Sequence, residues 1–158
     1  MNSNKSSHRL PNPIRQGLAS ALVDVFSKGF FADQVVEYYF RNQRKWGSRD
    51  RRNFAENLFD VVRWLRPLVK VVGWKWNEEW NDGPSLTSRF SALTNVSTQQ
   101  WLEVIEAWES LKNEVHENGF WPHENDWSLK HSISDFLLGH FNLDIQQIDE
   151  KNLFCLNQ

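Results

Sequence analysis

Cysteine and glycine are scarce in this chain, and each scarcity excludes a class of chemistry. Cys155 is the single cysteine among 158 residues, which excludes an intramolecular disulfide and a zinc site built from several thiolates. The seven glycines lie at least ten residues apart, whereas loops that cradle a nucleotide phosphate need closely spaced glycines. The five histidines lack the spacing of a metal site. We therefore expect no catalytic residue, no metal ion and no cofactor in this chain.

Long apolar runs are also missing. No stretch approaches the roughly 20 apolar residues that a helix needs to span a bilayer. The N-terminal sequence MNSNKSSHRLPNP is polar and lacks the apolar centre of a signal peptide. A length of 158 residues fits one domain with its own hydrophobic core. We expect a cytoplasmic protein without a membrane partner.

Helical periodicity dominates after residues 1–13, which we expect to form a flexible lead-in. Apolar residues recur every three or four positions in 14–26 and 32–43 and again from Ser48 onward. Pro67 is expected to end this third helix, because proline removes a backbone donor and clashes with the preceding turn.

A further helix is expected to open with a capping box of Ser97 and Gln100 and to end at Gly119. Its glutamates recur at helical spacing and are expected to face solvent: Glu103, Glu106 and Glu109. Shorter helical segments are expected at 68–72, 86–93, 132–141 and 145–156. No segment alternates between apolar and polar residues as a strand does, so the sequence predicts an all-α fold.

The net charge of −2 conceals two halves of opposite sign. Residues 1–70 carry 13 Lys and Arg against 6 Asp and Glu, a net charge of +7. Residues 71–158 carry 5 against 14, a net charge of −9. The positive charge is concentrated at 41–52, RNQRKWGSRDRR. Arginine matches phosphate oxygens and an indole can stack on an unpaired base, so this segment predicts contact with RNA.

Helical spacing divides the basic residues of the third expected helix into two groups. One group lies opposite or beside the apolar face and is predicted to contact RNA together with the preceding turn: Lys45, Trp46, Arg49, Arg52, Arg63 and Arg66. Arg51 falls on the apolar side instead. We expect a structural role for Arg51, in an ion pair with Glu56 or bound to a backbone carbonyl.

A second interpretation of the basic segment stays open. Glu56 and Asp60 each lie within one helical turn of an arginine, so local ion pairs can offset part of the positive field. The charges would then only solvate the helix. Trp46 has the same ambiguity, because tryptophan belongs to protein cores more often than to stacking surfaces.

The basic segment also resembles a known family. The sequence KWGSRDRRNFAE at 45–56, followed by VVRW at 61–64, is similar to the N-terminal region of bacterial rRNA cytosine-5 methyltransferases of the Sun/Fmu family. FFAD at 30–33 and SISDFL at 132–137 resemble further segments, the latter the family's Ser-Ile-Pro-Asp-Trp-Leu element. The chain departs from the family at Asp60, where many members have glycine, and at two positions of that last element.

The resemblance implies a NusB-like bundle of about six to eight helices over residues 14–158 that docks rRNA. In the family, S-adenosylmethionine and two catalytic cysteines belong to a Rossmann-type methyltransferase domain, which is expected to be absent from this chain. The chain is therefore expected to be an RNA-binding accessory domain without activity of its own. It would serve a methyltransferase domain or a separate catalytic partner.

The alternative is a helical protein-interaction module, of the antitermination-factor type or another partner-binding type, without a role in RNA binding. Nine tryptophans motivate it, because exposed aromatic residues often anchor protein interfaces. Burial of the tryptophans in the acidic half would count against it: Trp74, Trp76, Trp80, Trp121 and Trp127.

Overall fold

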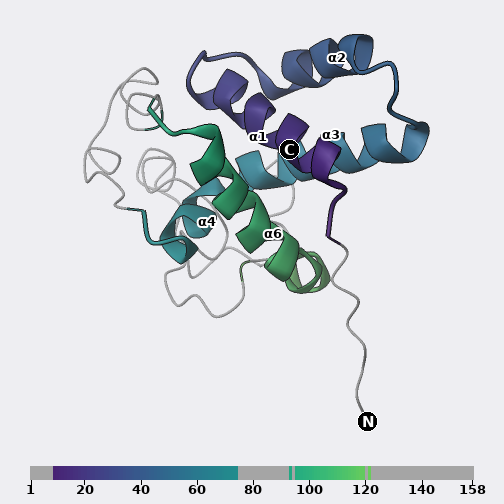
Figure 1. The fold of residues 1–158 in the computed structure, drawn as a ribbon. Coiled ribbons are helices and arrows are strands. Elements are labelled where there is room, and N and C mark those ends of the chain that lie inside the picture. Colours follow the sequence, from purple (N-terminus) through teal and green to yellow (C-terminus); the bar gives the residue numbers. More distant parts are fainter. Residues whose placement is uncertain (1–8, 75–92, 94, 120, 122–158) are drawn as a thin grey trace, which may run out of the picture.

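The computed structural model describes residues 9–74, 93, 95–119 and 121 (Figure 1). Within these residues the chain forms five helices and no strand: α1 (Asn12–Phe26), α2 (Ala32–Asn42), α3 (Ser48–Arg63), α4 (Leu65–Val71) and α6 (Thr98–Asn118). The all-α prediction is confirmed for this part of the chain. Five helices are fewer than the six to eight that the resemblance implies. The expected segments 86–93, apart from Leu93, and 132–141 and 145–156 lie outside the described residues.

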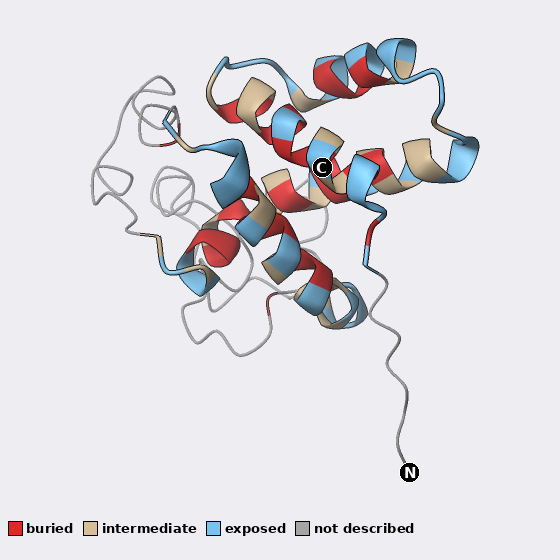
Figure 2. Ribbon diagram, in the orientation of Figure 1, coloured by how far each residue is buried: buried red, intermediate tan, exposed pale blue. Residues whose placement is uncertain are grey.

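Helix α1 lies at the centre of the described fold and packs against α2, α3 and α6 (Figure 1). Apolar residues recur along it every three or four positions and are all buried: Ile14, Leu18, Ala21, Leu22, Val25 and Phe26. Figure 2 shows that buried residues gather on the sides where the helices face one another. The predicted apolar face of α1 is therefore the centre of the core.

The chain joins the fold earlier than the expected lead-in suggests. Helix α1 begins at Asn12, and Leu10 before it is 6% exposed. The Leu10 N–H donates to Glu109 Oε1 of α6 at 2.7 Å, and Arg15 Nε lies 3.4 Å from Glu109 Oε2. Leu10 and Arg15 thus attach the start of the described chain to α6, whereas residues 1–8 lie outside the described residues.

Glu109 corrects one prediction about α6. Glu103 and Glu106 are exposed as expected, but Glu109 is buried. A carboxylate can be buried when a donor and a cation compensate for its lost hydration, and Leu10 and Arg15 supply them. Helical spacing could not foresee this, because both partners come from the other end of the chain.

The end of α3 also differs from the prediction. Helix α3 ends at Arg63, and Trp64 leaves helical geometry at φ −98° and ψ 19° before α4 begins at Leu65. Pro67 therefore lies in the first turn of α4, and the expectation that it ends the preceding helix is wrong. Proline is tolerated in a first turn because the N–H groups there have no acceptor within the helix.

Both ends of α6 form as the sequence predicts. The Gln100 N–H donates to Ser97 Oγ at 3.3 Å, and the Ser97 N–H donates to Gln100 Oε1 at 3.0 Å. Gly119 follows the helix at φ +73°, a left-handed conformation that glycine adopts without steric cost. The intervening helix carries two fully buried tryptophans, Trp101 and Trp108, into the core.

A hydrogen bond inside the core joins α3 to α6. Trp108 Nε1 donates to Asn57 Oδ1 at 3.1 Å. The Asn57 amide donates in turn to the Asn53 carbonyl at 2.6 Å, within α3. Because Asn57 is only 5% exposed, its side-chain carbonyl depends on Trp108 rather than on water. This contact fixes the register of α3 against α6.

Trp108→Phe is expected to lower the free energy of unfolding more than Trp101→Phe does. Both indoles are fully buried on α6, but Trp101 Nε1 has no hydrogen-bond partner among the described residues. Only the loss of Trp108 leaves the Asn57 carbonyl unpaired, which costs about 1–3 kcal/mol. Urea unfolding of the two variants measures the difference, and equal losses would contradict this role for the hydrogen bond.

Candidate nucleic-acid interface

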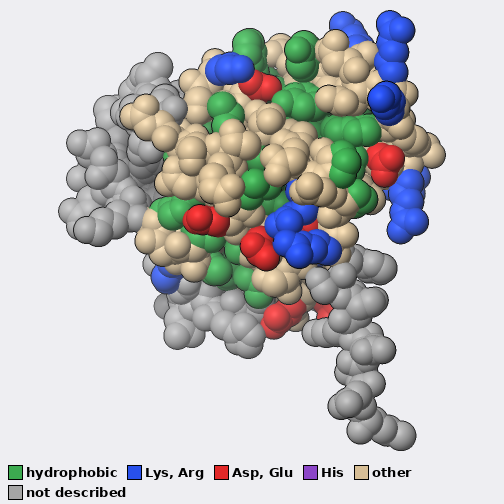
Figure 3. Space-filling view, viewed as in Figure 1, with side chains coloured by type: hydrophobic (Ala, Val, Ile, Leu, Met, Phe, Trp, Pro, Cys, Tyr) green, Lys and Arg blue, Asp and Glu red, His purple; other side chains and the backbone are tan. Residues whose placement is uncertain are grey.

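The connection between α2 and α3 gathers exposed cations at one end of the molecule. Figure 3 shows Lys and Arg side chains along the edge over this connection. We call the exposed set the basic turn: Arg41, Arg44, Lys45, Arg49 and Arg52. Two helix ends bring these residues together. Arg41 lies in the last turn of α2, and Arg49 and Arg52 lie in the first two turns of α3.

Little negative charge offsets the basic turn. Arg41 pairs with Glu37, one turn earlier in α2, at 3.0 Å between two exposed side chains. Asp50, the single acid within 41–52, accepts a hydrogen bond from the Gly47 N–H at 3.3 Å and so caps α3. Among the described residues, no carboxylate pairs with the four remaining cations. The N-terminus of α3 adds its partial positive charge to theirs.

Trp46 packs against the fold beneath the basic turn. Its ring centroid lies 4.9 Å from that of Phe54 and 6.4 Å from that of Tyr39. A Cβ at Gly17 of α1 would lie 3.0 Å from the indole, so only glycine lets the ring approach α1 this closely. Trp46 is half-buried. These contacts favour the core interpretation of Trp46, and its stacking on a base stays a prediction.

Arg51 fastens the turn from the inside. Its Nε donates to the Trp46 carbonyl at 3.2 Å, and its guanidinium lies over the Phe40 ring at 5.6 Å from the centroid. Of the two partners that the sequence predicts for Arg51, the structure shows the backbone carbonyl. The ion pair with Glu56 stays a prediction. Arg51 thereby holds the turn that presents the exposed cations.

Arg63 and Arg66 do not belong to the basic turn. They are half-buried, whereas Arg49 and Arg52 are exposed, so the expectation that all four face solvent holds for two of them. About 16 Å of helix separates Arg52 from Arg63 at a rise of 1.5 Å per residue. The Arg63 guanidinium lies over the Trp64 ring, 5.4 Å from its centroid. The predicted contacts thus divide into an exposed group and a distant, partly covered pair.

Three exposed residues near the site were not among the predicted contacts. Arg41 and Arg44 lie within the basic sequence but before the third expected helix, so its helical wheel does not include them. Phe59 is 46% exposed on α3. Its position seven residues after Arg52 and four before Arg63 places it on the same face, which is the signal that could have found it.

A titratable pair joins α3 to α6 beside Arg63. His116 Nε2 lies 3.1 Å from Asp60 Oδ2. Burial raises the pKa of Asp60 because the charged carboxylate loses hydration, and the nearby His116 and Arg63 oppose this shift. The carboxylate is therefore easier to protonate in the folded protein than in the unfolded chain.

The described residues offer no metal centre. No group of three or more His, Cys, Asp or Glu side chains among them is placed to hold a metal ion. No helix in this part of the chain has the length and apolar character to cross a bilayer. The chemistry that the described surface supports best is the binding of a polyanion.

Comparison with known proteins identifies no relative. No protein-family model, no curated protein and no solved structure matches the chain. The similarity to the N-terminal region of the Sun/Fmu methyltransferases and the NusB-like topology therefore stay predictions.

Asp60→Asn is expected to change how stability depends on pH. Because the pKa of Asp60 is raised in the folded protein, the folded state keeps this proton to a higher pH than the unfolded chain does. Its contribution to the free energy of unfolding therefore falls as the pH rises from the ordinary value of 3.8 through the raised pKa. Asp60→Asn has no carboxylate at this position and lacks this fall. The free energy of unfolding of the variant should therefore rise relative to that of the wild type as the pH increases through this range.

Urea unfolding at a series of pH values measures the effect. Glu103→Gln, which removes an exposed carboxylate from α6, serves as the control. The free energy of unfolding of this control is expected to depend on pH as that of the wild type does. A difference between Asp60→Asn and wild type that stays constant with pH, or moves the other way, would refute the assignment.

Proposed function

We propose that this chain is an RNA-binding accessory domain that docks rRNA through the basic turn for an S-adenosylmethionine-dependent cytosine-5 methyltransferase. One observation carries the RNA contact: the exposed Arg44, Lys45, Arg49 and Arg52 lie together without a carboxylate partner among the described residues. Binding of such a cluster to a phosphate backbone releases condensed counterions, which supplies affinity.

Three other cations in the described part of the chain each lie beside a carboxylate. Arg9, Arg15 and Lys28 lie 3.6, 3.4 and 2.6 Å from carboxylates. The four cations of the basic turn other than Arg41 depart from this arrangement, because their charges accumulate in spite of their mutual repulsion. An accumulation of one sign costs stability and is typical of a surface that meets an opposite charge.

The scaffold under the turn also favours binding. Trp46 packs against Phe54 and Gly17, and Arg51 binds the Trp46 carbonyl. The backbone that carries the cations is therefore held before a ligand arrives, which lowers the entropy lost on binding.

The rRNA target and the methyltransferase rest on the resemblance alone. The sequence that carries it, 45–56, forms the second half of the basic turn and the first part of α3. Three of the five cations of the basic turn, Lys45, Arg49 and Arg52, thus lie within this segment. The domain itself would position RNA, and the methyl transfer would belong to the catalytic partner.

The protein-interaction alternative receives less support from the tryptophans that the structure describes. Trp121 is 4% exposed and lies 6.1 Å from Trp64 between ring centroids. Trp74 is half-buried, 5.6 Å from the buried Trp101. Trp76, Trp80 and Trp127 lie outside the described residues.

Replacement of Arg49 and Arg52 by glutamine together is expected to weaken binding to a labelled rRNA fragment. Loss of two phosphate contacts reduces the slope of log affinity against log salt by about 1.4 for a single strand. Fluorescence anisotropy at several salt concentrations measures both quantities. A reduction of the salt-dependence slope by this amount would indicate that two phosphate contacts are lost, as distinct from a loss of fold.

Arg9→Gln is the matched control, because Arg9 is an exposed cation that pairs with Glu106 of α6 outside the basic turn. It should bind as the wild type does. Wild-type affinity that is independent of salt would contradict the proposed function, as would a double variant that binds with unchanged affinity and slope.

A further inference from the structure

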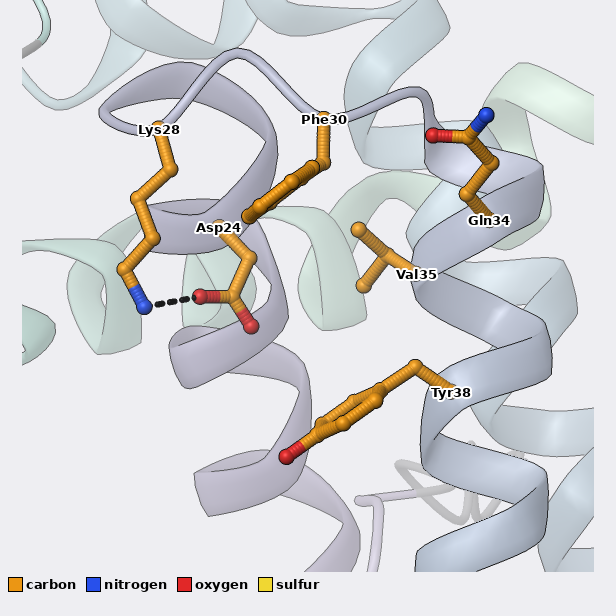
Figure 4. A pocket seen from close by; sticks show the side chains of 6 residues that line it. All are labelled: Asp24, Lys28, Phe30, Gln34, Val35 and Tyr38. Carbon is orange, nitrogen blue, oxygen red and sulfur yellow. Dashed lines mark hydrogen bonds and ion pairs between the residues drawn. The ribbon is translucent and has the colours of Figure 1, made fainter.

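A pocket lies between the end of α1 and α2 (Figure 4). Its volume is about 440 Å³, and it is lined by Asp24, Lys28, Phe30, Gln34, Val35 and Tyr38. Sites for small ligands commonly measure roughly 300–1,000 Å³. The pocket is therefore large enough for a planar ring system.

Two aromatic rings stand at opposite ends of this pocket (Figure 4). Phe30 is 53% exposed and Tyr38 is 61% exposed, although both are large side chains with much apolar surface. Gly29, at φ +75°, reverses the chain after α1, and the Phe30 N–H then donates to the Asp24 carbonyl at 3.2 Å. This turn fixes the backbone of Phe30 against the end of α1. A flat ligand would cover exposed aromatic surface here.

Polar groups of the pocket lining can bind the edge of such a ligand. Asp24 Oδ1 accepts from Lys28 Nζ at 2.6 Å, and Asp24 Oδ2 accepts from the Tyr39 hydroxyl at 3.4 Å. Each carboxylate oxygen keeps a further lone pair for a donor on the ligand. Gln34 adds an amide with both a donor and an acceptor. The lining thus combines stacking surface with hydrogen-bonding groups of both kinds.

The pocket and the basic turn share helix α2, which supplies Tyr38 to the first and Arg41 to the second. Tyr38 lies three residues before Arg41, a rise of about 4.5 Å along the helix axis. Residues three apart share one side of a helix, so the aromatic ring and the first cation of the turn are neighbours. An RNA strand whose phosphates contact the basic turn and continue along α2 would pass the pocket.

We propose that the pocket binds an unpaired nucleobase of the RNA whose backbone the basic turn holds. The base stacks on Tyr38 or Phe30, and its edge hydrogen-bonds to Asp24, Lys28 and Gln34. This assignment rests on the proposed function and narrows its substrate class to single-stranded or looped RNA, because bases within a duplex are not free to enter a pocket.

The test compares two strands of equal length, about 12 nucleotides. One is an unstructured RNA, and the other has the same sugar-phosphate backbone without bases. Stacking of one base corresponds to about 5- to 150-fold in affinity, so the wild type should prefer the base-bearing strand at least fivefold. Loss of the ring that stacks on the base, in Tyr38→Ala or in Phe30→Ala, should bring this ratio close to 1 with little change for the abasic strand, whereas Tyr38→Phe should retain it.

Phe31→Ala is the matched control, because Phe31 is 73% exposed beside the pocket but does not line it. It should keep the wild-type ratio, and circular dichroism should show that all variants are folded. Wild-type protein that binds both strands equally would overturn the pocket assignment and leave the proposed function intact. So would a preference that survives in Tyr38→Ala and in Phe30→Ala. Protein that binds neither strand would overturn both proposals.

Discussion

Burial of α1 among α2, α3 and α6 is the constraint on which both proposed binding surfaces depend. Gly17 of α1 lets Trp46 approach and so anchors the basic turn from below. The last turn of the same helix supplies Asp24 to the pocket, and the turn that follows it supplies Lys28. Its opposite end is tied to α6 through the contacts of Leu10 and Arg15 with Glu109. A shift of α1 would therefore disturb the turn, the pocket and the core together.

The aromatic cluster beneath the turn resolves a conflict between charge and compactness. Cations that gather without carboxylates repel one another and favour an open chain. The rings of Trp46, Tyr39 and Phe54 pack together under these cations. Arg51 does not add to the exposed charge, because it donates to the Trp46 carbonyl and lies over the Phe40 ring. Apolar packing thus holds in place a surface that electrostatics alone would disperse. The same packing keeps the cations together at one end of the molecule.

Polar groups in the core are concentrated where α6 meets the first helices. Glu109 binds the start of α1 and Asn57 binds Trp108, while the Asp60–His116 pair joins α3 to α6 nearer the surface. Apolar faces tolerate sliding by a turn, but a buried hydrogen bond is satisfied in one register only. These contacts join segments between 51 and 99 residues apart in sequence, so they form only after the helices have packed.

The sequence by itself determined whatever depends on neighbours within one or two helical turns. The buried face of α1, the capping box of Ser97 and Gln100, the Gly119 stop and the concentration of charge at 41–52 all follow from local spacing. Tertiary structure alone decided the burial of Glu109, the inward packing of Trp46, the separation of Arg63 from Arg52 and the exposure of Phe30 and Tyr38 around a pocket. Helical periodicity states which side of a helix is apolar, but the groups that meet a given side chain come from distant segments. Those distant partners decide whether a charge is compensated, an indole is covered or a ring is left open to a ligand.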